Sequence, residues 1–288
     1  MRRDPDYSSW GFVLSAVATL LPLAAGASTA TAEGEGFHAP TLGEFFPPAI
    51  LFEGTVFEFN RIMLVRVIAT LVLVTVFWLA ARRAKLVPGR FQGAAEMALD
   101  VVRVQISEEV LGKESGRRAT PVLTVIFFGV FAMNITGVIP GLNIAGSSVI
   151  GIPLLFALIA YVAFIAAGVR SQGVGGYLKA SLFPPGVPKV LYIILTPIEF
   201  LSTFILRPAT LTIRLLANMV AGHLLLVLAF GATHYLFLEA SGAMKGLGVI
   251  TLVGGVAFTF FEIFIAVLQA YVFTLLTAVY IQLSEEAH

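Results

Sequence analysis

Apolar residues gather into long runs along this chain, and the lengths of the runs predict membrane spans. Residues 62–81, 121–140 and 147–168 form runs of about 20 residues, the length that an upright helix needs to cross the hydrocarbon core. Residues 190–231 and 246–283 form runs of 42 and 38 residues. The pattern therefore predicts an all-α polytopic membrane protein with about five membrane helices.

The last two runs are too long to stand upright in a bilayer. At 1.5 Å per residue, each helix would extend ~60 Å, about twice the hydrocarbon thickness. No polar loop interrupts either run. We therefore predict a long, tilted, near-horizontal helical hairpin that turns within residues 232–245. A helix lying flat in lipid exposes its polar groups unless another protein covers them, so a protein partner is implied.

The segments outside the spans predict the organisation of the rest of the chain. Residues 1–30 have a basic start, an apolar stretch and then small residues, which is typical of either a signal peptide or an uncleaved N-terminal anchor helix. Both alternatives place residues 31–61 on the outer surface and leave residues 62–288 as the membrane-embedded domain. Apolar residues spaced by three or four predict an amphipathic helix over about residues 90–112 on the cytoplasmic face.

Basic residues indicate which ends of the spans face the cytoplasm. Arg82, Arg83 and Lys85 follow the first span, and Arg170 and Lys179 follow the third. Because cytoplasmic loops carry an excess of lysine and arginine, both of these ends are predicted to be cytoplasmic. Five spans then place the C-terminus in the cytoplasm as well.

The composition agrees with a membrane protein and excludes several other functions. The chain is 58% hydrophobic and 12% charged, against roughly 25% charged in soluble domains. Its net charge of +1 argues against a nucleic-acid partner. It has no cysteine and only four scattered histidines, and it contains neither a phosphate-binding loop nor a catalytic constellation. We therefore expect no cofactor, no metal site and no enzymatic activity, but a role in transport or coupling.

Arg214 is the most informative residue, because it lies within the apolar stretch RPATLTIRLLANMVAGH. A guanidinium group stays charged at any reachable pH, and a cation at membrane depth costs at least ~2.5–3.5 kcal/mol. Such a residue is a functional hypothesis by default. The alternative is a structural arginine that reaches a lipid headgroup or, like neighbouring Arg207, pairs with an acid such as Glu199.

Helical spacing separates the polar residues of the first long run into two faces. At 100° per residue, Arg207, Arg214 and Asn218 share one face, whereas His223 lies half a turn away from Arg214. Imidazole exchanges protons near physiological pH and guanidinium does not. A fixed cation and a titratable group therefore occupy opposite sides of one predicted helix.

A second set of polar residues shares one face of the other long run. It consists of Glu262, Gln269 and Tyr280, spaced by seven and eleven residues. Taken singly, His223, Glu262 or Gln269 is equally consistent with a hydrogen bond that only packs the hairpin. Taken with Arg214, the set favours proton movement. Asn134, in the MNITGVIPG span, has the same two interpretations, and an interhelical hydrogen bond is the structural one.

Three motifs in this order resemble the a subunit of F-type ATP synthases. They are MNITGVIPG, RPATLTIRLLANMVAGH and LQAYVFTLLTAVYIQLSEEAH, and the resemblance extends over roughly residues 40–288. It implies a proton-conducting subunit in the cell membrane of a bacterium, with two half-channels and a tilted hairpin held against a rotating ring of c subunits. It also implies b subunits of the peripheral stalk as partners, besides the lipid bilayer.

The resemblance also implies roles for individual residues. Arg214 matches the arginine of the family's RL-x-(A/G)-N motif, which faces the ring carboxylates and separates the half-channels; Asn218 is the motif's asparagine. Gln269 matches the glutamine of the last helix. His223 and Glu262 occupy positions where relatives carry an acid and a histidine, so the two residue types are exchanged. Because an acid and an imidazole are kept in either order, we infer that His223 and Glu262 lie together in the outer half-channel, with Gln269.

Other positions match the family less closely. Leu216 stands where many relatives have phenylalanine, an apolar exchange of little consequence. Glu199 resembles the upstream acid of the inner half-channel, although its spacing to Pro208 differs by about one residue. Asn134 and Tyr280 are further candidates for proton translocation.

Two other classes of protein remain as alternatives. A self-contained ion or solute secondary transporter would show internal repeats with broken helices at matching places, and the chain shows no such symmetry. A non-conducting membrane scaffold would have no need of Arg214 or of the His223 and Glu262 set.

Overall fold

The apolar runs form helices that account for nearly all of the described chain. The computed structural model describes residues 45, 48–51, 59–82, 89–139, 142, 144–183, 188, 191–240, 242 and 244–286. The N-terminal segment 1–30 and most of residues 31–61 lie outside the described residues. A short antiparallel pair, β1 (Ala49–Leu51) and β2 (Phe59–Asn60), precedes the first membrane helix.

Five helices in the described part of the chain are long and apolar enough to cross a membrane, so the prediction of an all-α polytopic membrane protein is confirmed. Leu71, Val72 and Val74 of α2 are each more than half exposed, an apolar surface suited to lipid rather than to water. The helices are Arg61–Arg82, Gln92–Ile135, Gly151–Leu182, Tyr192–Leu238 and Met244–Glu286.

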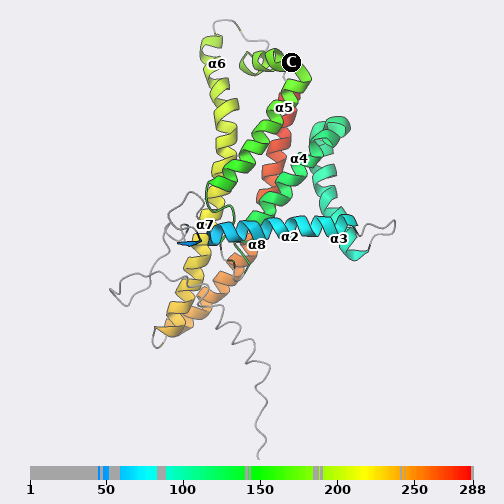
Figure 1. Cartoon of the computed structure of the whole chain (residues 1–288). Coiled ribbons are helices and arrows are strands. Elements are labelled where there is room, and N and C mark those ends of the chain that lie inside the picture. Colours follow the sequence, from blue (N-terminus) through cyan, green and yellow to red (C-terminus); the bar gives the residue numbers. More distant parts are fainter. Residues whose placement is uncertain are drawn as a thin grey trace, which may run out of the picture.

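The first of these helices lies across the others. In Figure 1, α2 (Arg61–Arg82) runs across the direction of α4 (Glu109–Ile135), α5 (Gly151–Leu182), α7 (Arg207–Leu238) and α8 (Met244–Glu286). These helices therefore cannot all lie along one membrane normal. The 22 residues of α2 match the hydrocarbon thickness, whereas the 43 residues of α8 exceed it. The arrangement is the one expected if α2 stands upright and the long helices are tilted.

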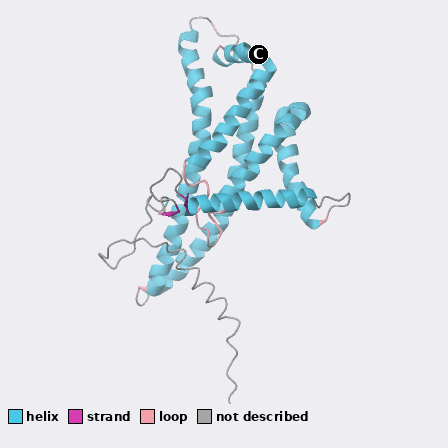
Figure 2. Ribbon diagram, in the orientation of Figure 1, coloured by secondary structure: helices cyan, strands magenta, loops and turns pink. Residues whose placement is uncertain are grey.

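The two longest helices form the predicted hairpin, with different boundaries. The first is continuous through α6 (Tyr192–Phe200), the π-helical segment η4 (Leu201–Leu206) and α7. It extends seven residues beyond the predicted end at residue 231, so the turn is confined to residues 239–243. Figure 2 shows α7 and α8 as unbroken helices on either side of this turn.

The connections contain two sharp reversals that hydrophobic patterning does not reveal. The predicted amphipathic helix is present as α3 (Arg90–Asp100) and the π-helical segment η2 (Val101–Glu108). Gly112 has a φ of 74° and Gly173 a φ of 74°, a left-handed conformation that glycine adopts readily. At Gly112 the chain folds back, so that the Ser107 hydroxyl donates to the Gly116 carbonyl at 2.7 Å.

The reversal at Gly173 lies within α5 and joins the end of this helix to the end of α8. The Gln172 side chain donates to the Ser284 carbonyl at 3.2 Å. The carbonyls of the last turn of a helix lack partners within the helix, so this contact caps α8. It also places the two helix ends on the same side of the molecule, as Figure 1 shows beside the C-terminus.

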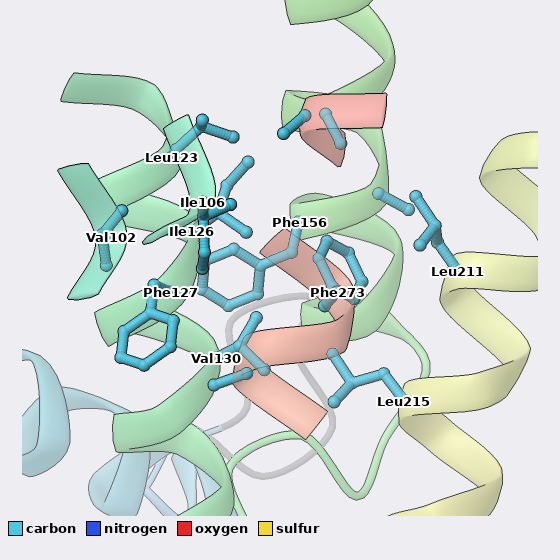
Figure 3. Packing of buried hydrophobic residues seen from close by; sticks show 14 of the residues in the cluster. Val102, Ile106, Leu123, Ile126, Phe127, Val130, Phe156, Leu211, Leu215 and Phe273 are labelled. Carbon is cyan, nitrogen blue, oxygen red and sulfur yellow. The ribbon is translucent and has the colours of Figure 1, made fainter. Parts of the chain in front are cut away.

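The core forms where α4, α5, α7 and α8 meet. Figure 3 shows Phe156 of α5 and Phe273 of α8 between Val130 of α4 and the α7 residues Leu211 and Leu215. These five side chains are at most 7% exposed. In addition, η2 contributes buried residues from outside the hairpin, Val102 and Ile106, both 0% exposed. The packing fixes which face of α7 points inward and which points outward.

Candidate functional site: polar residues of the α7–α8 hairpin

Arg214 lies on the outer surface of the helical bundle. Its neighbours Leu211 and Leu215 are buried against the core at 1% and 0% exposure, whereas Arg214 itself is exposed. The described chain provides no ion pair for its guanidinium, since the salt bridges among the described residues are Arg103–Glu108 and Arg118–Glu114. The predicted structural alternative, a pair between Arg214 and Glu199, is therefore not formed.

Three small side chains lie beside Arg214 on the exposed side of α7. Thr210, Ala217 and Ala221 are all exposed and lie three, four or seven residues from Arg214 along α7. These spacings place them on the same side of the helix as Arg214. Small residues let another helix approach closely within a membrane. The arginine therefore stands in a shallow strip on α7 that a partner helix can reach.

Arg207 does not share this environment, although its spacing predicted one face with Arg214 and Asn218. The Arg207 guanidinium lies 5.1 Å from the centre of the Tyr280 ring of α8. It also lies 5.8 Å from the centre of the Phe164 ring of α5. The long side chain bends inward to reach the aromatic rings, which a helical wheel alone does not predict.

Glu262 is buried at the contact between α7 and α8. It is 7% exposed, and its carboxyl group packs directly on Gly222, where a Cβ atom would collide with it. Gly222 is the residue before His223, whose ring meets the Phe45 ring edge-to-face at 4.9 Å between centroids. The predicted pair of Glu262 and His223 is thus brought to the same level of the hairpin, although their side chains occupy different surroundings.

Several buried amide groups lack a hydrogen-bond partner in the described chain. They include the Nδ2 atom of Asn218 on α7 and the Nε2 atom of Gln269 on α8. Gln269 is 8% exposed. A buried donor without a partner costs about 1–3 kcal/mol, and ordered water is the usual solution in a protein interior. Both amides therefore have a donor that water could satisfy.

A second polar cluster closes the connection between α4 and α5. Asn134 is 1% exposed, and its Oδ1 atom accepts a hydrogen bond from the Ser147 hydroxyl at 2.6 Å. Ser147 belongs to the connection before α5, so this bond is not the interhelical hydrogen bond that was the structural interpretation of Asn134. Its Nδ2 atom and the Ser148 hydroxyl are buried without a partner in the described chain.

Two arginines of α2 donate hydrogen bonds to the segment that connects α4 and α5. Arg61 donates to the Leu142 carbonyl at 3.0 Å, and Arg66 donates to the Gly146 carbonyl at 2.9 Å. The connection extends through residue 150, so α5 begins at Gly151 rather than at the predicted residue 147. Arg66 therefore connects α2 to the segment between α4 and α5.

The other candidates lie towards the opposite end of the hairpin. Glu199 is half-buried near the end of α6, and the described chain shows no ion pair for it. Tyr280 contacts Arg207 and lies 6.0 Å from Phe164 between ring centres. Glu199 thus lies 23 residues before Gly222, the residue on which Glu262 packs, and therefore away from the Glu262 carboxyl group.

Sequence reasoning did not find the contributions of Gly222, Ser147 and Ser148. None of these residues titrates at physiological pH, and their importance comes from what they touch. The short spacing of Asn134 to the paired serines was the available signal for the α4–α5 cluster. For Gly222 the available signal was its position before His223, which places a residue without a side chain beside a titratable one.

Replacing Gly222 with alanine is expected to destabilise the packing of α7 on α8. The added methyl group would collide with the Glu262 carboxyl group, and overpacking a buried contact costs about 1–3 kcal/mol. Gly254→Ala is the matched control, because nothing lies within 4 Å of a Cβ at that position of α8. The thermal unfolding temperature of the detergent-solubilised protein is the measurement. Equal unfolding temperatures for the two variants would contradict a tight contact between Gly222 and Glu262.

The fold and the polar groups together define a class of protein. The chain is a multi-pass helical membrane protein with an exposed arginine on α7 and a carboxyl group buried between α7 and α8. Residues 63–282 match the family described as ATP synthase A chain. The match extends over more than half of the chain, so the protein belongs to this family.

Individual relatives agree with this assignment. The chain is 50% identical to the ATP synthase subunit a of Rhodococcus erythropolis over 260 residues, which cover 90% of this chain and 94% of that protein. It is 39% identical over 246 residues to the ATP synthase subunit a of Pseudarthrobacter chlorophenolicus, covering 85% and 92% of the two chains. The Parafrankia protein of the same name is 42% identical over 263 residues. The family resemblance of the three motifs is thereby confirmed.

Proposed function

We propose that this chain is the proton-conducting, non-catalytic a subunit of an ATP synthase membrane sector, and that Arg214 couples proton flow to rotation of a ring of c subunits. The observation that carries the proposal is the position of Arg214. It is exposed on an apolar helical surface, among small residues, and the described chain gives it no counter-ion. A cation in this place needs an anionic partner from another protein, because lipid offers none at membrane depth.

A carboxyl group on each ring subunit supplies the missing charge. At 4 Å and an effective dielectric constant of 20, the attraction between the two charges is ~4 kcal/mol. That attraction favours the ionised carboxylate and remains small enough for the carboxylate to leave. Thr210, Ala217 and Ala221 support this assignment, because they let a ring helix come within reach of the Arg214 guanidinium.

The outer half-channel in this proposal passes through Glu262 and His223. Glu262 is buried on the side of α7 that faces α8, away from the exposed strip that carries Arg214. The unpartnered amides of Asn134, Asn218 and Gln269 support a wet path, because each needs water to complete its hydrogen bonds. Protons enter from outside along these groups and neutralise a ring carboxylate.

The inner half-channel in this proposal passes near Glu199. A neutralised ring site turns into lipid at low cost, since only the charged form is expensive to bury. After nearly a full rotation the site loses its proton near Glu199 and passes Arg214 as an anion. Arg214 keeps the two half-channels apart because a permanent cation repels a proton. Tyr280 belongs to the packing around Arg207 in this scheme rather than to the proton path.

The energetics require several protons for each ATP and hence a rotating ring. One unit charge crossing 100 mV supplies ~2.3 kcal/mol.

The location and the remaining partners follow from the family and from the basic residues. We place the protein in a bacterial cell membrane with residues 31–61 outside and the C-terminus in the cytoplasm, beside b subunits of the peripheral stalk.

Cross-linking of the purified complex tests the proposal. Ala217→Cys, on the Arg214 strip, is expected to cross-link to a small, very apolar hairpin protein that carries a cysteine near its single mid-membrane carboxylate. Val74→Cys is the matched control, because Val74 is 59% exposed and belongs to α2 rather than to the Arg214 strip on α7. Equal cross-linking at both positions would contradict the proposed ring surface.

A reconstitution experiment separates the proposal from the transporter alternative. Purified alone in liposomes, the chain is expected to carry no solute, because its ring partner is missing. Solute uptake by the isolated chain would instead favour a self-contained secondary transporter.

A further inference from the structure

We infer that Arg207 is a positioning residue that holds α7 against α5 and α8 through two aromatic rings and thereby sets where α7 presents Arg214. We call Arg207, Phe164 and Tyr280 the aromatic clasp. The contact of Arg207 with the two rings does not depend on any function. Its consequence for coupling rests on the function proposed above for Arg214.

The clasp joins three helices at one point. The Arg207 guanidinium carbon lies 5.1 Å from the centre of the Tyr280 ring and 5.8 Å from the centre of the Phe164 ring. Both distances are within the ~6 Å over which a cation is attracted to a ring face. The two rings lie 6.0 Å apart with an interplanar angle of 70°, and Phe164 is 1% exposed. Packing therefore restrains the buried Phe164 ring, and Tyr280 lies against it.

The rings take the place of an acidic partner. Within the described residues, neither of the two salt bridges includes Arg207. Arginine is suited to such a site, because its planar and weakly hydrated group stacks on aromatic faces. The cation–π interaction is stronger where water is excluded. Arg207 is thus a second cation of the hairpin, held by this chain itself, in contrast to exposed Arg214.

The backbone around Arg207 explains why α7 needs an anchor at this point. Residues Leu201–Leu206 form the π-helical segment η4, and Pro208 follows Arg207. Proline lacks the N–H group that would bond within the helix, and π-helical turns interrupt the regular hydrogen-bond pattern. The hydrogen bonds within the helix therefore constrain only weakly how α7 is rotated about its own axis near Arg207. A side chain fixed to α5 and α8 supplies the missing constraint.

The constraint reaches Arg214 through a regular helix. Arg214 is seven residues further along α7, which corresponds to about 10.5 Å of rise and about 20° of rotation. From Arg207 to Leu238 the helix is continuous, so a rotation of α7 at the clasp would move the Arg214 guanidinium relative to a ring carboxylate. Electrostatic contacts of this kind depend on placement to within about 1 Å.

A double-mutant cycle in the assembled ATP synthase tests the clasp. The variants are Arg207→Leu, Tyr280→Leu and their combination, and the readout is ATP-driven proton pumping per ATP hydrolysed in inverted vesicles. Each single variant is expected to lower this ratio about threefold. The double variant should be no worse than the worse single variant, because the same contact is lost once. Multiplied losses in the double variant would overturn the inference.

Conservative variants separate the cation–π contact from other roles. Tyr280→Phe keeps the ring face and should retain nearly normal coupling, and Arg207→Lys keeps a cation and should lose less than Arg207→Leu. If Tyr280→Phe is as damaging as Tyr280→Leu, the hydroxyl group matters instead and the clasp is wrong. The comparison of Tyr280→Phe with Tyr280→Leu still tests the clasp if Arg207→Leu prevents assembly.

A thermal measurement distinguishes failure of the clasp from failure of the proposed function. The temperature at which the a subunit leaves the solubilised complex should fall in Arg207→Leu and Tyr280→Leu, with no further fall in the double variant. This readout does not depend on Arg214. Normal pumping by an Arg214 variant would contradict the proposed function, whereas independent thermal effects of Arg207→Leu and Tyr280→Leu would contradict the clasp.

Discussion

Replacing Arg214 with alanine is expected to abolish ATP-driven proton pumping while the complex still assembles. Assembly should survive because the exposed guanidinium makes no ion pair within the described chain. Removing it also relieves the cost of a cation at membrane depth, at least ~2.5–3.5 kcal/mol. Pumping should be lost because no fixed charge then draws a ring carboxylate into its ionised form.

The same variant should raise the passive proton leak through the membrane sector. In the proposed mechanism Arg214 separates two wet half-channels, and alanine supplies no barrier charge between them. Fluorescence quenching in inverted vesicles measures both pumping and leak. Arg170→Ala is the matched control, since Arg170 is also an exposed arginine but lies towards the end of α5. Normal pumping in Arg214→Ala would end the assignment of Arg214 as the coupling residue.

Exchanging His223 and Glu262 is expected to retain more pumping than either single change. The carboxyl group of Glu262 packs on Gly222, directly before His223, so both positions belong to one level of the α7–α8 contact. Each single change leaves two groups of the same type at this level. Two carboxylates repel each other and disfavour ionisation, as do two imidazolium groups. We expect at least a tenfold loss in each single variant, about 1.4 kcal/mol, with partial recovery in the double variant.

A second pairing shows whether the recovery is specific. His234 is an exposed histidine of α7, eleven residues beyond His223. Combining His234→Glu with Glu262→His restores the same composition at the wrong level, so no recovery is expected. The measurement is again proton pumping per ATP hydrolysed. A swap of His223 and Glu262 that performs no better than the worse single variant would show that the two groups do not share a proton path.

The sequence determined the class of protein and the order of its membrane helices. Spanning length is a local property, because a run of apolar residues either matches the hydrocarbon thickness or exceeds it. The five runs therefore reappear as five helices, and the excess length of the last two indicated the hairpin. The place of Arg214 within an apolar run was equally local, because it can be read directly from the neighbouring residues.

Helical spacing gave part of the site and missed part of it. It placed His223 opposite Arg214, and the structure turns His223 towards Phe45 while Arg214 is exposed. It also placed Arg207 beside Arg214, where the structure instead bends the Arg207 side chain onto Tyr280. A helical wheel gives the direction of a Cβ atom, but a long flexible side chain ends where its partners are.

Only the tertiary structure decided which polar groups are buried, bonded or left without a partner. The contact of Glu262 with Gly222 joins residues 40 positions apart, and the bond from Arg66 to Gly146 joins residues 80 apart. The reversals at Gly112 and Gly173 likewise bring distant segments together. Such contacts depend on how helices pack against one another, and apolar helices in lipid offer many packings of similar hydrophobic burial. The sequence by itself thus determined the apolar runs and the charged residues within them. Helix packing decided which of these residues are buried and what each one contacts.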